Sequence, residues 1–292
     1  MVRRLVLVLL TVGLTACASP EPAESPAAPA PSRPTSPSPD TSATGDPSRA
    51  PTPAGPSYST WVLGSQVLPL RADGYGEVRA TPPSLRVRRY RTVDLLPPPL
   101  DGAFRSSTGP VTDALRARMG ETWQPGCPVP LADLRYVTVG FRGFDGAAHT
   151  GELVVAAGEA TDVVSVFRAL FRAGYPIEEM RLPTTADLVA PPTGDGNNTA
   201  AMVCRPTTGS TTTLSAHAYG LAIDLNPFVN PYERGDLVLP ERASSYLDRS
   251  WRRPGMHADG SVAVREFARI GWSWGGDFQS LKDYHHFTAT GR

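Results

Sequence analysis

The chain has 292 residues, of which 28 are Lys or Arg and 28 are Asp or Glu, so its formal net charge is zero. A chain without an excess of either charge has no general electrostatic attraction to nucleic acid or anionic lipid, which argues against a nucleic-acid-binding protein. The length allows one large domain or two small ones.

Residues 1–17 have the pattern of a bacterial export signal. Arg3 and Arg4 supply positive charge, and residues 5–14 form an apolar run too short for a hydrocarbon layer of about 30 Å. The run ends in LTAC, which resembles a lipobox, the motif whose cysteine is diacylated and becomes the new N-terminus. We therefore expect export, with Cys17 as a lipid anchor on the outer face of the cell membrane, facing the cell wall. Secretion after cleavage nearby is the alternative.

Residues 18–58 consist mostly of Pro, Ala, Ser and Thr. Such a composition offers almost no large apolar side chain to offset the entropy of ordering, so we expect a disordered, partly polyproline tether. At about 3.1 Å per extended residue the tether would reach on the order of 100 Å. An anchored domain could then search the cell wall above the membrane.

Residues 59–125 contain no recognisable chemical motif. Two stretches, WVLGSQVLPL and SLRVRRYRTVDLL, are bounded by Pro and Gly and predict short strands. The sequence leaves two interpretations open, a strap on the main domain or a small β-rich accessory module.

Two cysteines remain once Cys17 is set aside, Cys127 and Cys204. An exported chain reaches an oxidising compartment where disulfides persist, and an even number of cysteines favours pairing. We therefore expect a disulfide between them, with two separate buried thiols as the alternative.

The clearest secondary-structure signals lie in residues 126–292. The stretches 133–144 and 151–157 have the alternation and composition of strands. Asp145 and Gly146 between them are typical turn residues, so the sequence predicts an antiparallel hairpin.

Two helices are expected in the same region. Apolar residues at helical spacing predict a helix over residues 160–174, with Thr161 as its N-cap and Gly174 at its end. A last helix is expected over residues 261–270. Strands interspersed with helices predict an α+β fold, an antiparallel sheet with flanking helices.

One histidine and one aspartate flank a glycine in SAHAYGLAIDL, residues 215–225. If GLAIDL is a strand, Asp224 lies on the face opposite its apolar residues. His217 converges on Asp224 only if the chain bends between them, which Gly220 permits. Imidazole nitrogen and carboxylate oxygen are zinc ligands. The pair alone is weak evidence, and a buried strand with two stray polar residues is the alternative.

A second fragment, DYHHF, places Asp283, His285 and His286 on a strand-like run near the C-terminus. One of these histidines would complete a set of two histidines and one aspartate, which leaves a fourth zinc position for water. A carboxylate three residues before a liganding histidine could take the proton of that water. The two fragments together therefore predict a catalytic zinc site.

The stretches SAHAYGLAIDLNPFVNPY and GWSWGGDFQSLKDYHHF resemble the signatures of a bacterial zinc peptidase family. That family includes D-alanyl-D-alanine carboxypeptidases and L-alanyl-D-glutamate endopeptidases. Its pattern is S-x-H-x-x-G-x-A-x-D, followed by G-W-x-W-G-G-D-[WF] and [DE]-x-x-H-[FW], and NNTAAMVCRPTTGS resembles its C-R-x-x-x-G-S segment. The resemblance covers roughly residues 131–288 and implies a hedgehog/D-Ala-D-Ala peptidase-like fold.

Carried over position by position, the resemblance implies zinc ligands at His217, Asp224 and His286. It also implies that Asp283 is the general base and that Arg205 steadies the substrate carbonyl or carboxylate. A surface salt bridge is the alternative role for the arginine.

One departure from the pattern concerns the base. Many carboxypeptidases of the family have glutamate there, so Asp283 followed by Phe287 leans toward the endopeptidase branch. His285 is expected to be a bystander or a groove residue. Three aromatic residues could wall the groove or belong to the core: Trp272, Trp274 and Phe278.

The implied function is a Zn²⁺-dependent peptidase that hydrolyses amide bonds in peptidoglycan stem peptides. We expect a monomer that contacts the membrane only through its lipid anchor and has no nucleic-acid partner. The alternative is a catalytically silent, zinc-dependent cell-wall-binding lipoprotein. The presence of Asp283 beside three candidate ligands favours the enzyme.

Overall fold

The computed structural model describes residues 57–291. The predicted export signal, its lipidation site Cys17 and the predicted tether up to residue 56 lie outside the described residues. Within residues 57–291, no helix combines the length and the apolar character that crossing a bilayer requires.

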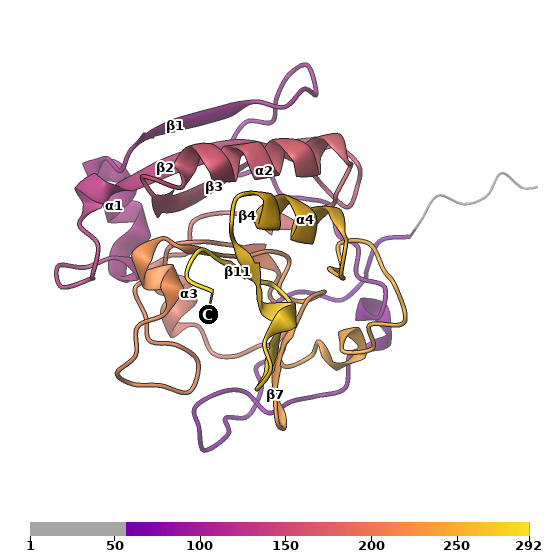
Figure 1. Ribbon diagram of the computed structural model, residues 1–292. Helices are drawn as coiled ribbons and strands as arrows, with labels where there is room; N and C mark the ends of the chain where they lie inside the picture. Colours follow the sequence, from indigo (N-terminus) through magenta and orange to yellow (C-terminus); the bar gives the residue numbers. More distant parts are fainter. Residues whose placement is uncertain (1–56, 292) are drawn as a thin grey trace, which may run out of the picture. The chain divides into compact units, whose positions relative to one another are not determined.

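Four α-helices are interspersed among strands along the described chain (Figure 1). The helices are α1 (Asp113–Met119), α2 (Ala160–Arg172), α3 (Thr185–Val189) and α4 (Val262–Arg269). The strands are β1 (Ser106–Pro110), β2 (Leu134–Arg142), β3 (Ala148–Ala156), β4 (Glu179–Met180), β5 (Asn198–Thr199), β6 (Ala222–Asp224), β7 (Tyr232–Arg234), β8 (Leu237–Leu239), β9 (Ser273–Trp274), β10 (Lys282–Asp283) and β11 (His286–Thr288). Helices and antiparallel sheets are thus present, as an α+β fold requires, and β4–β5 is a parallel pair.

The predicted hairpin is confirmed as β2 and β3. The two strands pair antiparallel from Leu134 opposite Ala156 to Arg142 opposite Ala148. Gly146 has a φ of 83° in the connecting turn, a conformation that glycine adopts without strain. β1 pairs with the other edge of β2, which completes the sheet β1-β2-β3.

Helix α2 covers one face of this sheet (Figure 1). Six of its residues are buried, Ala160, Val163, Val166, Phe167, Leu170 and Phe171, and α4 packs beside it. The main core combines this helix with the inward-facing residues of the hairpin: Val137, Val139, Phe141, Leu153 and Val155. The amphipathic pattern read from the sequence therefore identified the buried face of the helix correctly.

The ends of the two long helices match the sequence only in part. Gly174 follows α2 with a φ of 65°, as predicted. Thr161 is not the N-cap, because a turn from the Glu159 amide to the Ala156 carbonyl (3.0 Å) puts Glu159 at that position. Helix α4 lies inside the predicted range and has Ser261 at its N-cap.

Residues 57–105, called the N-terminal segment below, contain neither of the two predicted strands. The segment has one 3-10 turn, Pro83–Leu85, and an isolated bridge between Leu70 and Gly76. Pro69 lies inside the first predicted strand and removes an amide donor that a strand ladder would need, whereas the prolines at positions 82, 83 and 97–99 only bound the second. The prediction of strands in these two stretches is therefore wrong.

The N-terminal segment shares a core with the rest of the described chain. Leu85 packs with Phe228 and Tyr246 in a second apolar cluster. Arg88 forms an ion pair with Glu178 at 2.6 Å, and the two side chains are 0% and 5% exposed. The folding of the N-terminal segment is therefore coupled to the folding of the residues that follow it.

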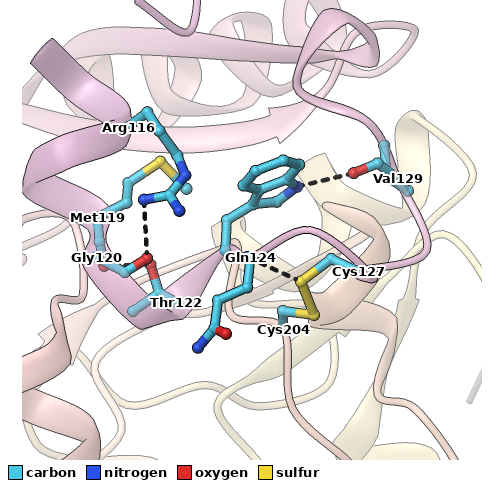
Figure 2. Close-up of a disulfide and its surroundings, with 9 residues drawn as sticks. Arg116, Met119, Gly120, Thr122, Gln124, Cys127, Val129 and Cys204 are labelled. Carbon is cyan, nitrogen blue, oxygen red and sulfur yellow. Dashed lines mark hydrogen bonds between the residues drawn. A yellow bond between two sulfur atoms is a disulfide. The ribbon is translucent and has the colours of Figure 1, made fainter. Parts of the chain in front are cut away.

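The predicted disulfide joins Cys127, in the loop after α1, to Cys204, which follows β5 (Figure 2). The loop that carries Cys127 is further held by Trp123, whose indole N–H donates to the Val129 carbonyl at 2.8 Å. The Gln124 amide also lies 3.2 Å from the Cys127 sulfur. The bond therefore fixes the chain immediately before Arg205.

Removal of this disulfide, by replacing Cys127 and Cys204 with serine, is expected to lower the free energy of unfolding by about 2–4 kcal/mol. The bond closes a loop with a sequence separation of 77, so its loss restores conformational entropy to the unfolded chain. Urea denaturation measures the difference, and reduced parent protein serves as the control. An oxidised parent no more stable than the variant would contradict the prediction.

His257 is fully buried between elements of the C-terminal half. Its Nδ1–H donates to the Tyr284 carbonyl at 2.7 Å, and its Nε2 lies 2.7 Å from the Tyr175 hydroxyl. Burial lowers the pKa of His257 to about 3, because the charged ring would lose its hydration, and the nearby guanidinium of Arg249 adds to the fall.

This histidine predicts a specific acid sensitivity. The unfolded chain takes up a proton at His257 near pH 6.5, whereas the folded chain does so only near pH 3. The contribution of neutral His257 to the free energy of unfolding is therefore complete above pH 6.5. It is lost as the pH falls toward 3, by about 1.4 kcal/mol per pH unit. A His257→Asn variant keeps a donor for the Tyr284 carbonyl and should lack this component. Urea denaturation from pH 4 to pH 7 tests it, and identical pH slopes would contradict it.

Candidate metal centre and its cavity

His217 lies in a short 3-10 helix, Ala216–Tyr219, which ends at Gly220. The Ser215 hydroxyl caps this helix by accepting a hydrogen bond from the His217 amide at 3.3 Å. Gly220 has a φ of 66°, and a Cβ there would lie 2.6 Å from the Ala156 nitrogen, so only glycine fits. The bend that the sequence required between His217 and Asp224 is thus present.

Asp224 and His286 lie directly opposite each other on the antiparallel pair β6 and β11. The Asp224 Oδ1 is 3.0 Å from His286 Nδ1 and 3.1 Å from His217 Nε2. The two histidine nitrogens are 3.2 Å apart. The structure therefore brings together the three residues that the resemblance implied as ligands.

Hydrogen bonding and burial prepare these groups to bind a cation. The His217 Nδ1–H donates to the Ala201 carbonyl at 2.6 Å, which leaves the Nε2 lone pair facing the other two side chains. Burial lowers the pKa of His217 and outweighs the opposite effect of Asp224. Burial alone would raise the pKa of Asp224, but His217 and His285 hold it well below its ordinary value. The cluster combines a neutral imidazole with a carboxylate, a donor set suited to a divalent metal.

Asp283 lies on β10, next to this cluster in the same cavity. Its Oδ1 lies 2.9 Å from His285 Nε2, close enough for an ion pair although the two atoms lack hydrogen-bond alignment. The other ring nitrogen, Nδ1, lies 2.8 Å from the Asn230 carbonyl and donates to it. His285 therefore contacts the candidate base and lines the cavity, which makes it a groove residue.

All these side chains open into a cavity of about 910 Å³. Arg205 lines the same cavity, and its Nη1 donates to the Pro206 carbonyl at 3.1 Å. Within residues 57–291 Arg205 forms no ion pair within 4.0 Å, so the surface salt bridge considered above is not found. Arg205 therefore lines the cavity without a carboxylate partner in the described part of the chain.

The aromatic residues of the C-terminal fragment divide between core and cavity. Trp272 and Trp274 are 3% and 6% exposed and belong to the main core. Phe278 lines the cavity. The two alternatives left open by the sequence are therefore both realised, each for different residues.

Sequence reasoning gave no role to the wall formed by β7 and β8. Tyr232 and Leu239 face each other across these strands, and both line the cavity together with Glu241. Burial raises the pKa of Tyr232, and the nearby guanidinium of Arg234 offsets part of that rise. The Tyr232 hydroxyl is buried without a hydrogen bond in the described part of the chain. No local motif marks these residues, because only the pairing of β7 with β10 brings them to the cavity.

No curated protein matches the chain, and no solved structure does. Residues 208–289 match the family model described as D-alanyl-D-alanine carboxypeptidase. This stretch contains His217, Asp224, Asp283 and His286, whereas Arg205 and both cysteines of the disulfide precede it. The match supports a peptidase of this family for the part of the chain that holds the candidate metal centre.

Proposed function

We propose that the protein is a zinc metallopeptidase that hydrolyses amide bonds in peptidoglycan stem peptides. The observation that carries the proposal is the convergence of His217, Asp224 and His286 in one cavity with Asp283. The family match supports the peptidase, and a hedgehog/D-Ala-D-Ala peptidase-like fold remains a prediction.

The residues present fit a zinc ion. Two imidazole nitrogens and one carboxylate oxygen lie within 4.8 Å of one another, and the Ala201 carbonyl sets the tautomer of His217. Zinc held by these three side chains would polarise the scissile carbonyl and lower the pKa of a bound water toward about 7.

The remaining chemistry belongs to the chain itself. Asp283 is the proposed general base, which accepts a proton from the attacking water and returns it to the leaving amine. Arg205 presents several N–H donors that can hold a substrate carboxylate or the developing oxyanion. The disulfide at Cys204 limits the motion of the backbone next to this arginine.

Two features point to different bonds. The family match favours the terminal D-alanyl-D-alanine bond, whereas Asp283 followed by Phe287 favours the internal L-alanyl-D-glutamate bond. Incubation of purified protein with muropeptides, with and without a chelator, followed by mass spectrometry reports activity and bond together. Zinc binding at unit stoichiometry without cleavage of any stem peptide would favour the catalytically silent, wall-binding alternative.

Loss of a residue that only hydrogen-bonds to a metal ligand lowers metal affinity by roughly 10–100-fold. Replacement of Asp224, a proposed direct ligand, by asparagine is expected to lower zinc affinity by more than that. The amide keeps the shape of the side chain but removes the negative charge between the two histidines. Zinc content after dialysis against competing chelator measures the change. Parent protein stripped of metal and reloaded is the control, and equal retention by the variant would remove Asp224 from the ligand set.

We also propose that the protein is exported and anchored by a lipid on Cys17 to the outer face of the membrane, where it would act as a monomer on the cell wall. The N-terminal pattern of Arg3 and Arg4, the apolar run and LTAC support this location. Mass spectrometry of the mature N-terminal peptide tests it: a diacylated Cys17 is expected, and an intact residue 1 would overturn it.

A further inference from the structure

Glu241 is a deeply buried carboxylate on the wall of the cavity, directly after β8. Its side chain is 6% exposed. The N-terminal segment holds it: the Gly76 amide donates to Oε1 at 2.8 Å, and the Arg79 amide donates to the Glu241 carbonyl at 3.0 Å. The carboxylate therefore has a fixed position on the side of the cavity formed by β7 and β8.

No cationic side chain of residues 57–291 lies within 4.0 Å of this carboxylate. Two other glutamates that are as deeply buried each have an arginine partner, Glu178 with Arg88 and Glu152 with Arg118. Removal of a carboxylate from water is unfavourable unless charge or hydrogen bonds compensate it. Glu241 is thus the buried glutamate of this set that lacks its counter-ion.

The second oxygen of the carboxylate is available to a ligand. Oε2 has no hydrogen bond within the described residues, yet it is not among the buried polar atoms sealed from solvent. Glu241 lines the same cavity as His217, Asp224 and His286. Apolar neighbours, Leu239 and Pro240, line the same wall and limit the water that can compete.

We propose that Glu241 binds a side-chain ammonium group of the substrate, so that the cavity prefers peptides with a diamino acid residue, such as lysine, close to the scissile bond. An ammonium group supplies the missing positive charge and up to three N–H donors for Oε2. The inference rests on the proposed function, because it names the kind of peptide that the same cavity takes.

The test compares two peptides, acetyl-Lys-D-Ala-D-Ala and its Nε-acetylated counterpart, which lacks the positive charge. The zinc-loaded parent is expected to cleave the free-amine peptide with a kcat/KM about 10–100-fold higher, mostly through KM, as charge-assisted hydrogen bonds imply. In Glu241→Gln this preference should disappear. The glutamine oxygen can still accept the Gly76 amide, so the fold is retained. Glu233→Gln is the matched control, since it removes the same charge from β7 outside the cavity lining.

Calorimetric titration of both peptides into zinc-free protein separates this inference from the proposed function. If neither peptide is cleaved, the carboxypeptidase reading fails, and binding alone decides the inference. Tighter binding of the free-amine peptide by the parent and by Glu233→Gln, with no preference in Glu241→Gln, supports the subsite. Equal affinity of the parent for both peptides, or an unchanged preference in Glu241→Gln, overturns it.

Discussion

Replacement of Asp283 by asparagine is expected to lower kcat for stem-peptide hydrolysis by about 10²–10⁴-fold, the usual effect of losing a general base. The amide cannot accept the proton of the attacking water, whereas the three proposed metal ligands are unchanged. Zinc content should therefore equal that of the parent. Steady-state kinetics on muropeptides and metal analysis of the same preparations measure both quantities.

Asp277→Asn provides the matched control for this experiment. Asp277 also lines the cavity, but it is exposed, and within residues 57–291 it forms no ion pair or hydrogen bond with the three candidate ligands. Its variant should keep a kcat close to that of the parent. A parent-like rate in Asp283→Asn would remove Asp283 from the mechanism, and loss of zinc in that variant would show that its role is structural.

Replacement of Arg88 by methionine is expected to lower the free energy of unfolding by about 3–5 kcal/mol. The change leaves Glu178 buried, with only the Asn197 amide, at 3.0 Å, and no positive charge beside it. It also removes the contact of the guanidinium with the Phe228 ring, 4.4 Å from its centroid. Urea denaturation at neutral pH measures the loss.

Two further variants locate the origin of this effect. Arg88→Met combined with Glu178→Gln should be more stable than Arg88→Met alone, because no uncompensated charge remains. Arg79→Met removes a pair with Glu77 in which the side chains are 50% and 45% exposed, and should change stability by less than about 1 kcal/mol. A single Arg88 variant as mild as the Arg79 variant would show that the buried pair does not link the N-terminal segment to the later residues.

Elements defined by short-range patterns were predictable from the sequence. The β2–β3 hairpin and the buried stripe of α2 follow from the period of apolar residues and from local turn residues. The N-terminal segment was not, since its stretches between Pro and Gly resemble strands while its backbone partners lie far away in sequence. Leu68, for example, donates to the carbonyl of Pro192.

The candidate site, too, was predictable from the sequence only in part. The resemblance to the peptidase family implied that His217, Asp224 and His286 converge, and the pairing of β6 with β11 places Asp224 opposite His286. Tyr232 and Glu241 had no assigned role, because a cavity wall depends on how separate loops meet. Glu241 in particular is held by Gly76, which is 165 positions away.

The position of β11 at the centre of the sheet β6-β11-β9 affects how a metal would leave. His286 pairs with Asp224, and the next two residues of β11 pair with β9, so separating these two ligands requires opening an interior strand rather than moving a loop. Exchange of the ion should therefore be slow compared with side-chain motion. Saturation with metal should also raise the thermal midpoint of the whole chain by mass action.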